Sequence, residues 1–63
     1  MTLLTIDNAE LGQLVQWMEA DQWRVGVITD IYRQKPDDYI EIWIGDNWII
    51  VDASDSGQIY LTE

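Results

Sequence analysis

Residues 39–52 read Tyr39-Ile-Glu-Ile-Trp-Ile-Gly-Asp-Asn-Trp-Ile-Ile-Val-Asp52. Isoleucines alternate with polar or aromatic residues in the first half, which is the period-2 pattern of a strand with one buried face. β-Branched and aromatic side chains dominate both halves, as strands prefer. The residues between the halves, Gly45 to Asn47, have turn chemistry. We therefore predict a β-hairpin over residues 39–52, around which the rest of the chain can be arranged.

Two positions are open for the two-residue loop of this hairpin. A loop of Gly45-Asp46 puts glycine first in a type II′ turn and sets Trp43 opposite Trp48. A loop of Asp46-Asn47 (type I′) would set Glu41 opposite Asp52, and like charges directly opposite destabilise a sheet. We therefore predict the first register. In both, one face carries Ile40, Ile42, Ile44, Ile49 and Val51. The outward face carries Tyr39, Glu41, Trp43, Trp48, Ile50 and Asp52.

The other segments are short and mostly strand-like. Residues 24–32 alternate, which puts Val25, Val27, Thr29 and Ile31 on one face and Gly26, Ile28, Asp30 and Tyr32 on the other. Gly26 inside this strand predicts a bulge or a sharp bend. Residues 19–22 read as a polar loop, and residues 58–61 as a short last strand. Residues 1–10 form an N-terminal extension that begins as either an edge strand or a mobile tail.

Residues 9–18 fit two interpretations. Leu11, Leu14, Val15 and Met18 recur at helical spacing, and Asn8 could cap such a helix. Gly12 would then lie inside the helix, at a cost of about 1 kcal/mol relative to alanine. The alternative takes Gly12 as a turn and residues 13–17 as a strand. Periodicity alone does not decide between them. With the strand, the chain has about five short β segments separated by polar turns, which predicts a small barrel.

Composition excludes several kinds of chemistry. The chain has 63 residues, which is one domain, with no Cys and no His, so disulfides, Cys/His zinc sites and imidazole catalysis are excluded. Ser54 and Ser56 lack a histidine base, and the only lysine, Lys35, lies beside a proline. Oxygen ligands for Ca²⁺ or Mg²⁺ occur at Asp46, Asp52, Ser54 and Asp55, but without the spacing of an EF-hand loop. We predict a protein that is not an enzyme and has neither metal nor cofactor.

The net charge indicates which classes of partner are unfavourable. Twelve acidic and three basic residues give a net charge of −9. Direct binding to a phosphate backbone needs Lys and Arg, so nucleic acid and anionic membranes are not predicted partners. No apolar run approaches the ~20 residues of a membrane span, and the N-terminus lacks a basic signal-peptide region. We expect a cytoplasmic monomer. The acidity serves solubility, attraction to a basic partner or mimicry of a nucleic-acid surface.

The strand segments together resemble a known family. The residues that carry the resemblance are Gly12-Gln-Leu-Val15, Val25-Gly-Val-Ile-Thr-Asp-Ile31, Tyr39-Ile-Glu-Ile-Trp43 and Asp46-Asn-Trp-Ile-Ile-Val-Asp-Ala-Ser-Asp55. This order is similar to the short SH3-like barrel proteins of tailed phages, including myoviruses of cyanobacteria, over about residues 11–61. The resemblance implies a strand over residues 12–17 and a single 3₁₀ turn near residues 53–55. The chain departs from the pattern in its longer N-terminal segment and in residues 56–58. Most such proteins have no assigned role, so the resemblance implies a fold and a phage origin.

The outward face of the hairpin is the candidate site. Trp43 and Trp48 are either a cross-strand pair that stabilises the sheet or part of an exposed aromatic patch that binds a protein. A cage for a methylated cation would need three rings around one point, which no spacing fixes. We predict a protein-interaction module whose contacts are Tyr39, Trp43, Trp48 and Ile50, with charge preference set by Asp30, Asp37, Asp38 and Glu41. The partner is a host or phage protein, basic or proline-containing. An acidic inhibitor that mimics nucleic acid and a minor virion component are the alternatives.

Overall fold

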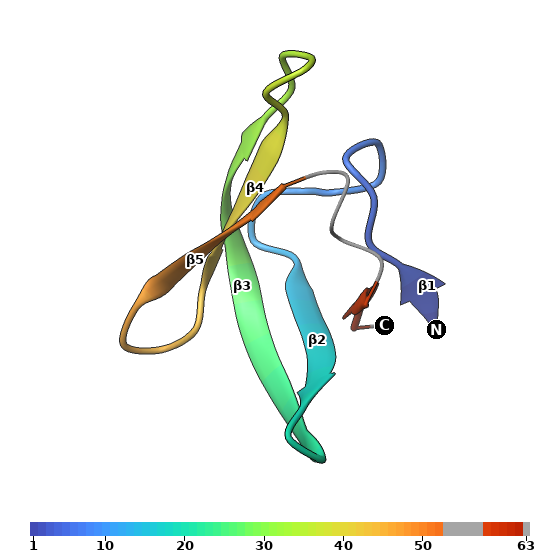
Figure 1. The fold of residues 1–63 in the computed structure, drawn as a ribbon, viewed down its shortest axis with the longest axis vertical. Helices are drawn as coiled ribbons and strands as arrows, with labels where there is room; N and C mark the ends of the chain where they lie inside the picture. Colours follow the sequence, from blue (N-terminus) through green and yellow to red (C-terminus); the bar gives the residue numbers. More distant parts are fainter. Residues whose placement is uncertain (53–57, 63) are drawn as a thin grey trace.

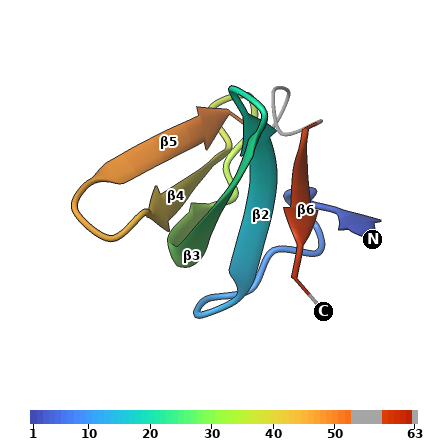
Figure 2. The ribbon, with the colours of Figure 1, turned by 90° about the horizontal axis from the view of Figure 1, so that it is seen from below.

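The part of the chain that the computed structural model describes, residues 1–52 and 58–62, folds as a single antiparallel sheet without a helix. Its strands are β1 (Thr2–Leu3), β2 (Leu14–Glu19), β3 (Gln22–Tyr32), β4 (Tyr39–Trp43), β5 (Trp48–Asp52) and β6 (Ile59–Leu61). Their order across the sheet is β1-β6-β2-β3-β4-β5 (Figure 1). The sheet is open, with β5 at one end and the N-terminal strand at the other (Figure 2). The all-β prediction is confirmed, and β1 is a strand beyond the five expected.

The β4–β5 hairpin has the predicted register. Trp43 pairs with Trp48 and Glu41 with Ile50. The Ile44 N–H donates to the Asn47 carbonyl at 2.9 Å, which closes the loop over residues 45 and 46. Gly45 has φ +105°, a conformation that favours glycine.

Residues 9–18 contain β2 instead of a helix. Gly12 has φ +83° and precedes the strand, as the strand interpretation requires. The polar loop predicted over residues 19–22 is wrong in extent, because Glu19 and Gln22 are already paired. Only Ala20 and Asp21 make the turn, with φ +50° and +64°. Both values lie in the left-handed region that two-residue hairpin loops use.

The predicted faces of β3 need a correction. The register between β3 and β4 shifts between Ile28 and Asp30, so Thr29 is the extra residue of a bulge. Its hydroxyl donates to Glu41 Oε1 at 2.8 Å. A bulge exchanges the faces of the residues that follow it. Ile31 therefore joins Ile28 on the inner face, opposite Ile40, instead of sharing a face with the outward Val27.

Gly26 is a point of close packing, not the bulge. It pairs in register with Val15 and is buried. A Cβ atom there would lie 2.4 Å from Ile42 Cγ2 and 3.0 Å from the Trp43 carbonyl oxygen. The absence of a side chain therefore lets the Ile42 side chain and the Trp43 backbone pack directly against Gly26. The core consists of Leu4, Ala9, Val15, Ile28, Ile40, Ile42, Val51 and Ile59.

The N-terminal segment is packed into the fold, so it is not a mobile tail. Leu4 is completely buried, and its N–H donates to the Ile59 carbonyl at 2.8 Å. Asn8 and Thr5 exchange side chain to backbone hydrogen bonds of 2.8 and 3.1 Å. The Arg33 guanidinium donates to the carbonyls of Ile6 at 3.1 Å and Ala9 at 2.8 Å. Arg33, the first residue after β3, thus fixes the backbone of residues 6–9 by two hydrogen bonds.

The 3₁₀ turn expected near residues 53–55, and residues 56 and 57 of the departure from the phage pattern, lie outside the described residues. Within those residues there is no helix long and apolar enough to cross a bilayer.

Candidate aromatic interface

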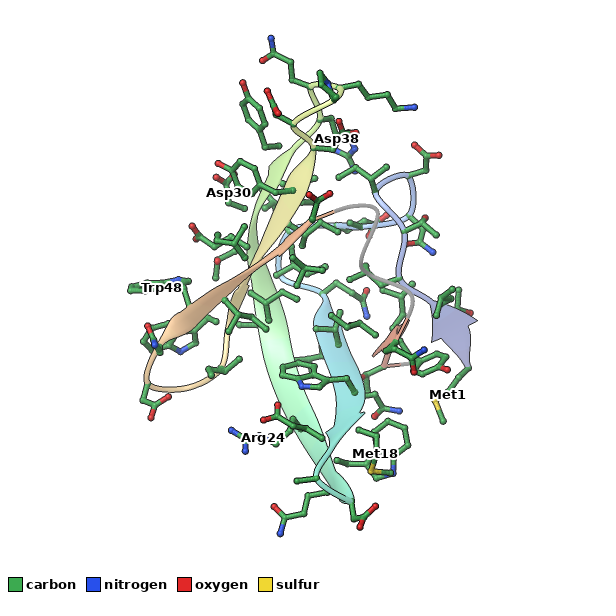
Figure 3. All side chains as sticks on the ribbon, in the orientation of Figure 1. Met1, Met18, Arg24, Asp30, Asp38 and Trp48 are labelled. Atoms are coloured by element: carbon green, nitrogen blue, oxygen red, sulfur yellow. The ribbon has the colours of Figure 1, made fainter. Side chains whose placement is uncertain are left out.

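The two tryptophans of the hairpin form a cross-strand pair on the outer face of the sheet. The Trp43 and Trp48 ring centroids are 4.4 Å apart, and the ring planes meet at 57°. Trp48 is 55% exposed, whereas Trp43 is half-buried. In Figure 3, Trp48 projects outward from the β5 side of the sheet, on the same side as Asp30. The pair therefore stabilises the sheet and at the same time exposes the Trp48 ring to solvent.

Trp43 and Trp48 belong to a longer apolar row. Leu14 pairs with Val27, and Val27 pairs with Trp43. Directly paired residues of an antiparallel sheet share a face, so these side chains lie side by side across four strands, from β2 to β5. Leu14 is 49% exposed at the far end of the row. Sequence reasoning found only the two tryptophans. The interpretation of residues 13–17 as a strand was the signal that could have led to Leu14.

A second aromatic pair lies further along the same face. Tyr32 and Tyr39 are Cα partners, and their rings stack with centroids 5.1 Å apart and an angle of 17°. Ile50 is 60% exposed. It lies opposite Glu41, between the tryptophan row and the tyrosine row. The structure thus brings Tyr39, Trp43, Trp48 and Ile50 together on one face.

The acidic residues predicted for the site do not all lie on its surface. Glu41 and Asp30 are Cα partners on the outer face, in the row of Ile50. Asp37 is exposed in the connection between β3 and β4. Asp38 departs from the prediction, because it is only 7% exposed and its Oδ1 atom has no hydrogen-bond partner. Its carboxylate is therefore not part of the exposed surface.

Two like-charged residues face each other at Asp30 and Glu41, the arrangement avoided in the β4–β5 register. Each carboxylate has a local donor. Asp30 Oδ1 accepts from the Ile31 N–H at 2.9 Å, and Glu41 Oε1 accepts from the Thr29 hydroxyl. Because the bulge at Thr29 supplies one of these donors, it makes the close approach of the two acids tolerable.

The described residues contain no group of three or more His, Cys, Asp or Glu that could hold a metal ion. Ser54, Ser56 and Asp55 lie outside them. Trp23 and Met18, which sequence reasoning did not assign to a surface, are 49% and 50% exposed and form a pair at the end of the β2–β3 hairpin. Figure 3 shows Met18 on the side of the molecule away from Trp48. By register, the Met18–Trp23 pair lies on the same face as the tryptophan row, two outward pairs beyond Leu14 and Val27, and Val25, which is 56% exposed, lies between them.

No protein-family model, curated protein or solved structure matches the chain.

Proposed function

We propose that the chain is a non-enzymatic protein-interaction module that binds its partner through the outer face of the β4–β5 hairpin. The observation that carries the proposal is the apolar row Leu14, Val27, Trp43 and Trp48, which has exposed side chains at both ends. Tryptophan is enriched among the residues that dominate binding energy at protein interfaces. The neighbouring acids Glu41 and Asp30 favour a basic partner.

We further propose that the protein is a small SH3-like barrel, encoded by a tailed phage, that acts in the host cytoplasm. A single antiparallel sheet whose long strand β3 has a bulge at Thr29 is compatible with such a barrel. The tight contact at Gly26 also suits a curved sheet. The partner is a host or phage protein. A role in the virion is a variant of the same proposal, in which the partner is another particle protein.

The test compares two tryptophans of similar exposure. Trp48 is 55% exposed on the proposed interface, and Trp23 is 49% exposed on the other hairpin. Tagged wild type, Trp48→Ala and Trp23→Ala are used to capture partners from the natural host, and a captured protein is then purified and its affinity measured directly. We expect Trp48→Ala to weaken binding at least tenfold and Trp23→Ala to leave it unchanged. Equal affinity of wild type and Trp48→Ala would contradict the proposal.

A second candidate is an acidic inhibitor that occupies a nucleic-acid-binding surface of a host protein. The observation that favours it is the use of Arg33, one of only three basic residues, to bind backbone carbonyls. That leaves the exposed acids Asp30 and Asp37 with little basic compensation. Such binding weakens steeply with salt and on neutralising both acids by Asp30→Asn and Asp37→Asn. Binding through the tryptophan row survives salt and these substitutions, so a salt titration distinguishes the two candidates.

A further inference from the structure

β5 is the last strand of the sheet and pairs with β4 alone among the described strands. Hydrogen-bonded and non-hydrogen-bonded pairs alternate along an antiparallel ladder. Ile44 and Asn47 are a bonded pair, so Ile42 pairs with Ile49 in a bonded pair and Glu41 pairs with Ile50 in a non-bonded one. The backbone groups of Trp48 and Ile50 therefore point away from β4, toward the end of the sheet.

Three of these outward groups have no partner among the described residues. The Trp48 N–H is already used, because it donates to Asn47 Oδ1 at 2.9 Å. The Trp48 carbonyl and both the N–H and the carbonyl of Ile50 remain. Protein edges are ordinarily protected by lysine, proline, a bulge or a very short strand. β5 contains no lysine or proline, it pairs with β4 without a register shift over five residues, and its one charged residue, Asp52, is at its end.

We propose that β5 binds an extended, basic segment of the partner as an additional antiparallel strand. This proposal rests on the proposed function and names the backbone edge as the site and a cationic strand as its ligand. A partner residue that pairs with Ile50 would exchange two backbone hydrogen bonds with it, which is the mode by which peptides extend exposed sheet edges.

Each residue of the added strand would continue one row of paired side chains on the outer face, so the row indicates which kind of side chain fits there. The partner residue beside Ile50 lies in line with Glu41 and Asp30, so a long cationic side chain there extends over Ile50 toward Glu41. The residue two positions further along lies beside Trp48 and its apolar row, so it is apolar. A second cation on the other side of the residue beside Ile50 adds to the attraction of the strand to a chain of net charge −9.

Charge also decides against a second copy of the chain as the occupant. Each copy carries a net charge of −9. Pairing of β5 with β5 would bring two chains of the same net charge together, and like charges across an interface are destabilising. A basic strand removes this repulsion and gains attraction.

The probe is the peptide acetyl-Thr-Lys-Val-Arg-Val-Leu-Thr-amide, which places Arg beside Ile50 and Leu beside Trp48 in the antiparallel register. Its matched control carries one N-methyl group on the Arg amide, which removes the donor to the Ile50 carbonyl and keeps the charge. Affinity is measured by calorimetry, and exchange of the Ile49 and Ile50 amide hydrogens by NMR. We expect the control to bind about tenfold more weakly. We also expect the parent peptide to slow exchange at Ile50 tenfold or more, with no change at Ile49.

Ile50→Pro removes the other backbone hydrogen bond of the proposed pair, the one that the Ile50 N–H would donate to the peptide. Proline is tolerated on an edge where the N–H faces solvent, so β4 pairing is retained and binding is lost. Equal affinity of the two peptides, no binding, or binding without protection of the Ile50 amide would each overturn the proposal. Protection of that amide without peptide, together with a dimer in sedimentation, would overturn it in favour of a second copy. The proposed function stands or falls separately, on the effect of Trp48→Ala on the captured partner.

Discussion

The two ends of the sheet are built in opposite ways. At the N-terminal end, β1 is only two residues long, and the chain then enters the core at Leu4. The segment that follows is held by Arg33 through two backbone carbonyls. At the other end, β5 has five residues, and its outward side chains Trp48 and Ile50 are more than half exposed.

We propose that this difference separates the part of the sheet that stabilises the fold from the part that binds a partner. A chain of this size has little core, so each buried apolar side chain is a large share of its stability. The N-terminal end adds Leu4 to the core and has its polar groups bonded. The β5 end adds Val51 to the core and pairs Trp48 with Trp43, but it leaves backbone groups and the Ile50 side chain in solvent, where they add little to folding. We infer that the N-terminal end closes the fold and the β5 end meets the partner.

The strongest test of this division is Leu4→Ala. Leu4 is 0% exposed, so its truncation leaves a cavity and lowers the free energy of unfolding by about 3 kcal/mol. Urea denaturation followed by tryptophan fluorescence measures the change. The control is Leu3→Ala, because Leu3 is 41% exposed and its loss changes stability by about 0.5 kcal/mol or less. Equal effects of the two substitutions would show that this end does not close the fold.

Arg33→Met is the next largest perturbation. It removes two hydrogen bonds from a charged donor to the carbonyls of Ile6 and Ala9, so we expect a loss of about 2 kcal/mol. Faster amide exchange in residues 4–9 would accompany it. Arg24→Met is the matched control, since Arg24 is exposed and makes no side-chain hydrogen bond with the described residues. The role given to Arg33 is wrong if both variants unfold at the same urea concentration.

A substitution in the turn between β2 and β3, the two central strands, should raise the free energy of unfolding instead of lowering it. Ala20 has φ +50° in the β2–β3 turn, a conformation that is unfavourable for a residue with a Cβ atom. Ala20→Gly should raise the free energy of unfolding by about 0.5–1 kcal/mol. Asp21→Gly should gain less, because aspartate tolerates this region better. Thermal unfolding compares the two, and a larger gain at Asp21 would contradict the strain assigned to Ala20.

The smallest effect is expected at the β5 end. Ile50 is 60% exposed, so Ile50→Thr keeps the strand and should change stability by about 0.5 kcal/mol or less. The same substitution at Ile40, which is 0% exposed on β4, should lower it by roughly 2 kcal/mol or more. Denaturation of both variants under identical conditions gives the comparison. A loss at Ile50 as large as that at Ile40 would mean that β5 closes the fold as well.

Local chemistry made the hairpin predictable. Glycine in the turn and the avoidance of Glu41 opposite Asp52 were sufficient to choose the register that the structure has. The alternating isoleucines identified the inner face in either register. The same reasoning could not choose between helix and strand for residues 9–18, because their apolar spacing suits both. Pairing of β2 with β3 and β6 decides that question.

Other features depend on contacts that no local pattern contains. The loop over residues 19–22 was predicted two residues too long, because alanine rarely adopts positive φ and a two-residue turn at Ala20 and Asp21 was therefore not expected; the paired strands on both sides impose it. The sequence predicted a bulge or a sharp bend at Gly26, since glycine is the usual local signal for either, whereas the bulge lies at Thr29. The burial of Leu4, the bonds of Arg33 and the apolar row from Leu14 to Trp48 all join residues distant in sequence. Of the candidate site, the hairpin half was predicted and the β2–β3 half was not.

The pairing of β1 with β6 has a practical consequence for attachment. Thr2 lies opposite Leu61, so both ends of the described chain emerge side by side, at the far end of the sheet from β5 (Figure 2). A tag, a surface linker or a fused domain joined at either end therefore leaves the β5 edge facing away from the support. The domain can also be inserted into a loop of a carrier protein through its adjacent ends, with the edge strand displayed outward.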